Sequence, residues 1–324
     1  MSTRSMRPKK SLALMASVIA AAVLAGTAAH AETLRVGKVV AQNFGFVPLN
    51  VGVDEGIFKK LGLDIKEIDF AGGAKQQQAV IAGSIDIAIG GGTDMGFIAK
   101  GSPIIGVAAI TASPKFMGFI AGDDPNLKTM ADLKGKKVGV STAGSTTKWM
   151  VDQLNQSQGW DAHGAIPVAI GGALPTELAA LKTHAVAAFV DAPAIGYQLE
   201  SEHAGHLMFT AGAYLKTFEV FVIYAANPLV ANNPGAIRRF LKGWFQAVEY
   251  MRGHKEQTVE IARKITGFSK PVEEREYDLL MPAFSTTGKF DKDALATLAQ
   301  SFVDLKMLPQ KPDMAKFYTE KFLP

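Results

Sequence analysis

Apolar and polar positions follow two alternating patterns up to about residue 230. Short runs rich in branched apolar residues are typical of strands buried on both faces, and amphipathic helical segments separate them. We predict strands at residues 34–40, 63–70, 85–89, 104–110, 137–140, 167–170 and 185–190, with helices at 48–61 and 75–82. This order predicts an α/β fold with largely parallel sheets.

The last third of the chain is predicted to be helical. Asn233 and Pro234 supply a cap and a first-turn proline, and apolar residues then recur at helical spacing from Ile237 to Met251. Further helices are predicted at residues 257–265, 272–280, 294–305 and 314–322. The aromatic residues of this stripe are typical of a core rather than of a ligand site.

Two segments of the chain resemble one another. Residues 81–91 read IAGSIDIAIGG and residues 181–191 read LKTHAVAAFVD. Each combines a helix end, a tight turn, a buried strand and a loop. Two lobes of similar design explain the likeness, and so does a chance similarity between two strands of parallel sheets.

Five hydroxyl side chains crowd one predicted strand-to-helix turn, STAGSTT at residues 141–147. Capping of the helix that begins near Thr146 explains one or two of them. The other interpretation is a small anion held at the helix N-terminus by N–H groups, the helix dipole and hydroxyl donors. The turn alone does not decide between the two.

Residues 1–31 have the pattern of a secretory signal peptide. A basic region precedes an apolar run at 12–24, and Ala29-His30-Ala31 matches the small-x-small cleavage pattern. The run is shorter than the ~20 residues that span a bilayer. The chain has no cysteine, which excludes both disulfides and lipidation on a thiol. We expect a soluble, exported protein whose mature chain starts near Glu32.

Removal of this leader changes the charge. The leader holds four basic residues, Arg4, Arg7, Lys9 and Lys10, and no acidic residue. Its removal lowers the number of Lys and Arg from 34 to 30, which equals the 30 Asp and Glu. The mature chain therefore has no basic excess that would favour nucleic acid or a membrane surface.

Four motifs follow one another in a distinctive order: DEGIFKKLGLDI at residues 54–65, GSIDIA at 83–88, DLKGKKVGV at 132–140 and KPDM at 311–314. Together with the Asn233-Pro234 helix start, they resemble periplasmic solute-binding proteins of ABC importers. The branch is the nitrate/sulfonate/taurine type, which includes relatives of the thiamine-pyrimidine binding proteins. The resemblance covers nearly all of the mature chain.

The resemblance implies a two-lobed periplasmic-binding-protein fold of type II. Each lobe would hold a mixed, mainly parallel sheet flanked by helices, with two crossover strands near residues 117–121 and 219–224. Lobe one would comprise residues 32–117 and 222–324, and lobe two residues 118–221.

A ligand is expected in the cleft, outside the carboxyl ends of the strands. The candidate ligand-binding residues follow those strands: Gln42, Asn43, Phe44, Gly73, Gly92, Thr93, Ser141, Thr142, Gly144, Ser145, Thr146 and Asp191. Tight turns explain the glycines equally well. Gln42 and Asn43 could instead be loop residues that face solvent. Phe44 could instead pack on lobe one without contacting a ligand.

Asp191 departs from the family pattern. Relatives carry an aromatic-acid-proline sequence after the last strand of lobe two, and this chain has Asp191-Ala192-Pro193. A carboxylate facing the cleft would favour an amine or hydroxyl and repel a bare inorganic anion. Capping of the following helix is the alternative.

The sequence therefore predicts an extracytoplasmic solute-binding component of an ABC transporter. It would capture a small organic anion or zwitterion, sulfonate- or taurine-like, by closure of its lobes, and act as a monomer with a membrane permease. We expect no catalytic residue, metal, cofactor or nucleic acid. The alternatives are an exported enzyme of the same fold and a ligand sensor for a membrane kinase.

Overall fold

The computed structural model describes residues 1–3, 31–160 and 163–324. Almost all of the predicted signal peptide lies outside the described residues. Residues Glu32–Pro324 form one compact unit, built on two five-stranded sheets. Their strands are β1 (Glu32–Lys38), β2 (Leu63–Asp69), β3 (Ile87–Gly91), β4 (Ile104–Thr111), β5 (Gly118–Gly122), β6 (Lys137–Val140), β7 (Ile166–Ala169), β8 (Ala188–Asp191), β9 (Gly205–Thr210) and β10 (Phe221–Ala226).

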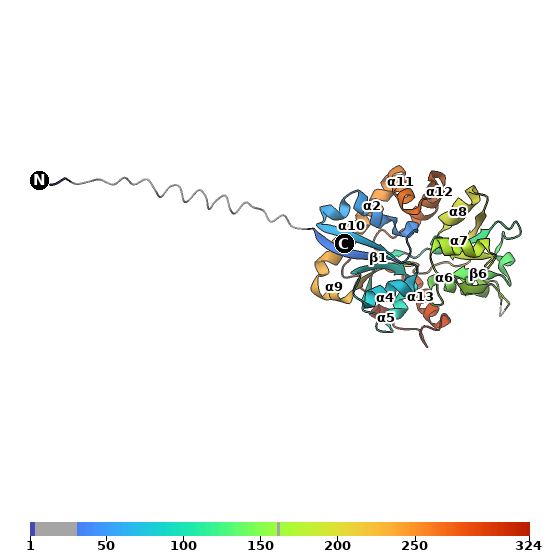
Figure 1. Ribbon diagram of the computed structural model, residues 1–324. Coiled ribbons are helices and arrows are strands. Elements are labelled where there is room, and N and C mark those ends of the chain that lie inside the picture. The colour runs from blue at the N-terminus through green and yellow to red at the C-terminus, as the bar shows by residue number, and fades with distance from the viewer. Residues whose placement is uncertain (4–30, 161–162) are drawn as a thin grey trace. The chain divides into compact units, whose positions relative to one another are not determined.

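Helices flank both sheets (Figure 1). They are α2 (Val47–Asp54), α3 (Ile57–Lys60), α4 (Gly73–Ile81), α5 (Met95–Ile98), α6 (Thr146–Ser157), α7 (Leu174–Lys182), α8 (Pro193–Ser201), α9 (Asn227–Asn232), α10 (Pro234–Gly253), α11 (Lys255–Thr266), α12 (Lys270–Leu280) and α13 (Lys292–Asp304). We call the parts built on the first and second sheets lobe one and lobe two.

The two sheets have the same strand order. Sheet one runs β2-β1-β3-β10-β4 and sheet two runs β7-β6-β8-β5-β9. In each sheet the first three strands are parallel, and the fourth is antiparallel to both of its neighbours. The two segments that resemble each other in sequence end in β3 and β8, which hold the same place in the two sheets. This correspondence supports the explanation by two similar lobes.

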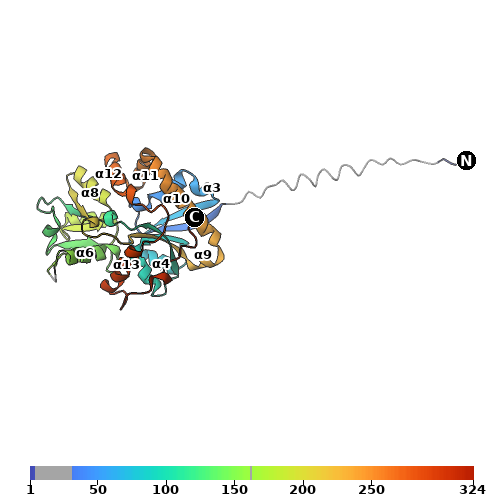
Figure 2. The ribbon, with the colours of Figure 1, turned by 180° about the vertical axis from the view of Figure 1, so that it is seen from behind.

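The chain crosses twice between the sheets. It leaves sheet one after β4 and enters sheet two at β5, and it returns from β9 to β10. Helices from the C-terminal third also touch lobe two, with α12 beside α8 and α13 beside α6 in both views (Figures 1 and 2). The Trp149 indole N–H on α6 donates to Asp304 Oδ2 on α13 at 3.0 Å. The lobe bounds predicted from the sequence stay a prediction.

One predicted helix is interrupted. The segment at residues 48–61 forms α2 and α3, separated at Gly56, whose φ of 65° is left-handed. A glycine takes this conformation without steric cost and so ends one helix and starts the next.

The helix predicted at residues 314–322 is wrong. Only Met314–Lys316 forms a short 3-10 turn, and Tyr318 then pairs with Gly106 of β4. The Gly106 N–H donates to Phe317 O at 3.0 Å, and the Thr319 N–H donates to Gly106 O at 2.8 Å. Because β4 is the edge of sheet one, this pairing satisfies exposed backbone groups that a helix would leave open.

Candidate functional site

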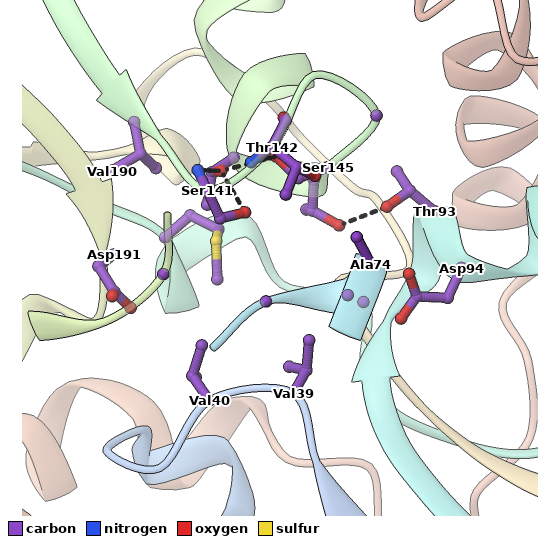
Figure 3. A pocket seen from close by; sticks show the side chains of 18 of the residues that line it. Val39, Val40, Ala74, Thr93, Asp94, Ser141, Thr142, Ser145, Val190 and Asp191 are labelled. Carbon is purple, nitrogen blue, oxygen red and sulfur yellow. Dashed lines mark hydrogen bonds between the residues drawn. The ribbon is translucent and has the colours of Figure 1, made fainter. Parts of the chain in front are cut away.

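A cavity lies between the lobes at the carboxyl ends of the parallel strands, and about 640 Å³ there, including space open to solvent, is not filled by protein atoms. Lobe one and its crossover contribute Val39, Val40, Asn43, Gly72, Gly73, Ala74, Gly91, Thr93, Asp94, Phe97 and Phe221. Lobe two and its crossover contribute Met117, Ser141, Thr142, Gly144, Ser145, Thr146, Thr147, Gly172, Glu177, Val190 and Asp191. Both sets point into one space (Figure 3).

The hydroxyl-rich turn forms one wall of this cavity. Ser145 is the N-cap of α6 and accepts a hydrogen bond from the Lys148 N–H at 3.2 Å. Its own hydroxyl donates to Thr142 O at 2.8 Å, and Thr147 Oγ1 accepts from the Ser141 N–H at 3.0 Å. Capping and bracing of the loop therefore occupy several hydroxyls, while the first-turn N–H groups of α6 have no partner within the helix.

A second helix begins on the opposite side. Gly72, with a φ of 102°, is the N-cap of α4. A Cβ built on Gly72 would lie 3.8 Å from Thr142 Cγ2, so the start of α4 in lobe one faces the hydroxyl-rich turn of lobe two. Two helix N-termini thus contribute partial positive charge to the same cavity.

A hydrogen bond inside the cavity joins loops that follow the two sheets. Thr93 Oγ1 and Thr146 Oγ1 are 3.1 Å apart and buried (Figure 3). Thr93 follows β3 in lobe one, and Thr146 opens α6 in lobe two. The structure therefore shows the lobes in contact.

Three carboxyl groups line the cavity. Asp94 is 4% exposed, and its Oδ2 has no hydrogen-bond partner among the described residues. Burial raises the pKa of Asp94 to about 7. Asp191 lies on the opposite wall (Figure 3), and its Oδ1 accepts from the Ala192 N–H at 2.7 Å. Burial raises the pKa of Asp191 as well.

Glu177, in the first turn of α7, is the third carboxyl and is 2% exposed. Burial raises the pKa of Glu177 well above its ordinary value, and the charge and hydrogen bonding of the adjacent Asp191 carboxyl raise it further. Two carboxyls in contact disfavour a second negative charge and tend to share a proton.

No lysine, arginine or histidine is among the described residues that line the cavity. Lys148, in the first turn of α6, pairs with Asp152 at 2.5 Å. Lys38 is 1% exposed, but Glu67 and Asp69 hold its ammonium group. Positive potential in the cavity therefore comes from backbone N–H groups and not from side chains.

Nine of the twelve candidate residues line the cavity: Asn43, Gly73, Thr93, Ser141, Thr142, Gly144, Ser145, Thr146 and Asp191. Gln42 instead lines an adjoining hollow of about 510 Å³, which shares Asp191 with the cavity.

Phe44 and Gly92 lie elsewhere. Phe44 is fully buried against Tyr277 and Phe284, at ring-centroid distances of 6.1 and 6.0 Å. It therefore packs in the core, which was the alternative to contact with a ligand. A Cβ on Gly92 would come within 1.8 Å of Glu219 O. Gly92 is thus required by close packing against the second crossover.

Sequence reasoning missed Asp94 and Glu177. Asp94 directly follows the candidate residues Gly92 and Thr93, and Glu177 lies in the first turn of the helix that follows β7 and the loop Gly171-Gly172-Ala173. The available signal was an acidic residue within one helical turn of a loop at the carboxyl end of a strand.

The described residues hold neither a candidate metal cluster nor a helix suited to span a membrane. No group of three or more His, Cys, Asp and Glu side chains there is placed to hold a metal ion. No helix in the same residues is long and apolar enough to cross a membrane.

Comparison with known proteins places the chain in a family. Residues 43–258 match the family described as NMT1/THI5 like, and the chain belongs to this family. Over 258 residues it is 30% identical to a Brucella abortus (strain 2308) protein named "Putative binding protein", covering 73% of this chain and 72% of the relative. It is 27% identical to the "Putative aliphatic sulfonates-binding protein" of Escherichia coli (strain K12), covering 77% of each.

Solved structures share the fold. The alkanesulfonate-binding protein SsuA of Xanthomonas axonopodis pv. citri, bound to MOPS, aligns over 89% of this chain and 98% of its own with a TM-score of 0.74 and 16% identity. The periplasmic aliphatic sulphonate binding protein SsuA of Escherichia coli aligns over 89% and 92% with a TM-score of 0.72 and 20% identity. The chain thus has the two-lobed periplasmic-binding-protein fold, with mixed, mostly parallel sheets.

Proposed function

We propose that this protein is the extracytoplasmic solute-binding component of an ABC transporter, and that it captures a small organic anion or zwitterion between its lobes. The observation that carries the proposal is the cavity at the carboxyl ends of the strands of both sheets, onto which the N-termini of α4 and α6 open. The binding-protein relatives and the shared fold support a capture role.

The mechanism is closure. A solute that contacts both lobes favours the closed state by its differential affinity for the two states. The anionic end of the solute lies at the first turn of α6, where the N–H groups of Thr146 and Thr147 have no partner within the helix. The closed protein is then presented, as a monomer, to a permease in the inner membrane after export to the periplasm.

The sequence and the cavity favour capture over catalysis. The cavity-lining acids Asp94, Glu177 and Asp191 are not paired with a His, Lys or Arg among the described lining residues, and the chain has no cysteine nucleophile.

Thermal-shift screening of the purified protein tests this function. The compounds are sulfonates, amino-sulfonates, amino acids, pyrimidines and inorganic anions. A solute at 100 times its dissociation constant should stabilise the protein by about 2.7 kcal/mol. Stabilisation by one class of organic anion or zwitterion supports the proposal, and the absence of any effect across all the classes contradicts it.

A further inference from the structure

Glu177 and Asp191 lie side by side at one end of the cavity. Glu177 Oε2 is buried without a hydrogen-bond partner among the described residues, although the side chain lines the cavity. Its place in the first turn of α7 is favourable for a negative charge near a helix N-terminus. The helix dipole does not account for a second carboxyl placed against it.

The surroundings of this pair add further negative groups. Glu276 on α12 faces Asp191 and accepts a hydrogen bond from the Ala194 N–H at 3.2 Å. Glu273, also on α12, faces Glu276, and the positive charge of Arg263 on α11 acts on the Glu273 carboxyl. That arginine forms its own ion pair with Glu260 at 3.0 Å. No cation among these groups neutralises Glu177 and Asp191.

We propose that Glu177 and Asp191 form a subsite for a protonated nitrogen, so that the solute is an amine-bearing zwitterion and not a simple sulfonate or inorganic anion. This proposal rests on the proposed function and narrows its substrate class. An ammonium group supplies up to three donors and a positive charge. It satisfies the unpartnered Glu177 Oε2 and offsets the repulsion between the two carboxyls.

The cavity then has two poles. The N-terminus of α6 and the hydroxyls of residues 141–147 receive the anionic end of the solute. The start of α4 does not, because a Cβ built on Gly73 would lie 2.9 Å from the Asp94 carboxyl. The carboxyl pair on α7 and β8 receives the amine. Specificity follows because an amine-free analogue leaves the carboxyl pair buried and unpaired.

Matched ligand pairs test the subsite. Binding is measured calorimetrically on the purified protein with taurine against ethanesulfonate, and with β-alanine against propionate. We expect the amine-bearing member of each pair to bind at least tenfold more tightly. Its binding should also release protons because the cation replaces the proton shared by the carboxyls, which is read from the dependence of the heat on the ionisation enthalpy of the buffer.

Variants assign the effect to these residues. Glu177→Gln and Asp191→Asn should each reduce the amine preference at least fivefold, while Glu219→Gln, a buried acid outside the cavity, should leave it unchanged. The proton release of the unmodified protein is an independent readout if a variant does not fold.

Each other outcome is decisive. Equal binding of ethanesulfonate and taurine, or equal proton release by both, overturns the subsite and leaves the proposed function standing. An amine preference that persists in Glu177→Gln and Asp191→Asn overturns the assignment to these residues. If neither pair binds and the broader screen also shows no stabilisation, the proposed function fails with it; if another class stabilises the protein and neither pair binds, only the subsite fails.

Discussion

The hydroxyls of Thr93 in lobe one and Thr146 in lobe two form a hydrogen bond, with their Oγ1 atoms 3.1 Å apart. Thr146 also stands at the start of α6, so the residue that touches the opposite lobe is the first residue of the helix whose N-terminus faces the cavity. Contact between the lobes and binding of a solute at this helix therefore involve the same residue.

Replacing Thr93 with valine removes this contact and keeps the shape of the side chain. One net hydrogen bond contributes about 1 kcal/mol, so we expect solute affinity to fall about fivefold. Thr33→Val, which removes an exposed surface hydroxyl bonded to Asp64 at 3.4 Å, is the control. Calorimetric titration of both variants with the same solute makes the comparison, and equal affinities would remove the role of Thr93 in closure.

A double substitution, Ser145→Ala with Thr146→Ala, tests the role of the hydroxyl-rich turn at residues 141–147 in solute binding. We expect solute affinity to fall at least tenfold because the variant loses the α6 cap and the hydroxyl that meets Thr93. Loss of the cap should also lower stability by about 1 kcal/mol. Ser157→Ala with Thr183→Ala removes two hydroxyls outside the cavity and should bind normally. Unchanged affinity in the first variant would reject the anion site at this turn.

Phe44 should matter for stability and not for specificity. Truncation of a fully buried phenylalanine to alanine costs about 3–5 kcal/mol, and Phe44 packs on Tyr277 and Phe284 away from the cavity. We expect Phe44→Ala to lower the urea midpoint strongly. Variant protein that remains folded should retain near-normal solute affinity, and a selective loss of affinity without loss of stability would return Phe44 to the binding site.

Glu219 gives a pH dependence of stability. Burial raises the pKa of Glu219 from 4.5 to about 8, with the Asp291 N–H opposing this shift. Because the folded state keeps this proton at pH values where the unfolded state has lost it, stability contributed by the neutral form is full below pH 4.5 and declines as pH rises to about 8.

We therefore expect Glu219→Gln to flatten the fall of the unfolding free energy between pH 5 and 8, measured by urea titration. Asp94→Asn should flatten it over a lower range because the pKa of Asp94 is about 7. A slope identical to that of the unmodified protein would show that Glu219 titrates normally.

Sequence pattern predicted most of the sheet strands because short runs of branched apolar residues are a local signal, although β9 (Gly205–Thr210) was not predicted. Residues 137–140 were predicted as a strand, and β6 is Lys137–Val140. The helix predicted at residues 314–322 was wrong because Tyr318 pairs with Gly106, which lies some 200 residues away in the sequence. Local propensity carries no information about such an edge.

The same limit applies to the cavity. The position of Asp191 at the carboxyl end of β8 could be predicted from the sequence, whereas its contact with Glu177 depends on how α7 packs on the sheet. Phe44 and Gly92 follow strands as a ligand contact would, but packing directs one into the core and the other against the backbone of Glu219.

The central claim is that a solute closes the two lobes on itself. The chain has no cysteine, so Lys100→Cys in lobe one and Gln156→Cys on α6 place two spin labels at exposed positions without competing sites. Pulsed electron–electron double resonance then measures the distance between the labels with and without a saturating concentration of the solute that stabilises the protein in the thermal-shift screen. We expect a broad or long distance without solute and a shorter, narrower one with it; full binding with an unchanged distance distribution would contradict the account.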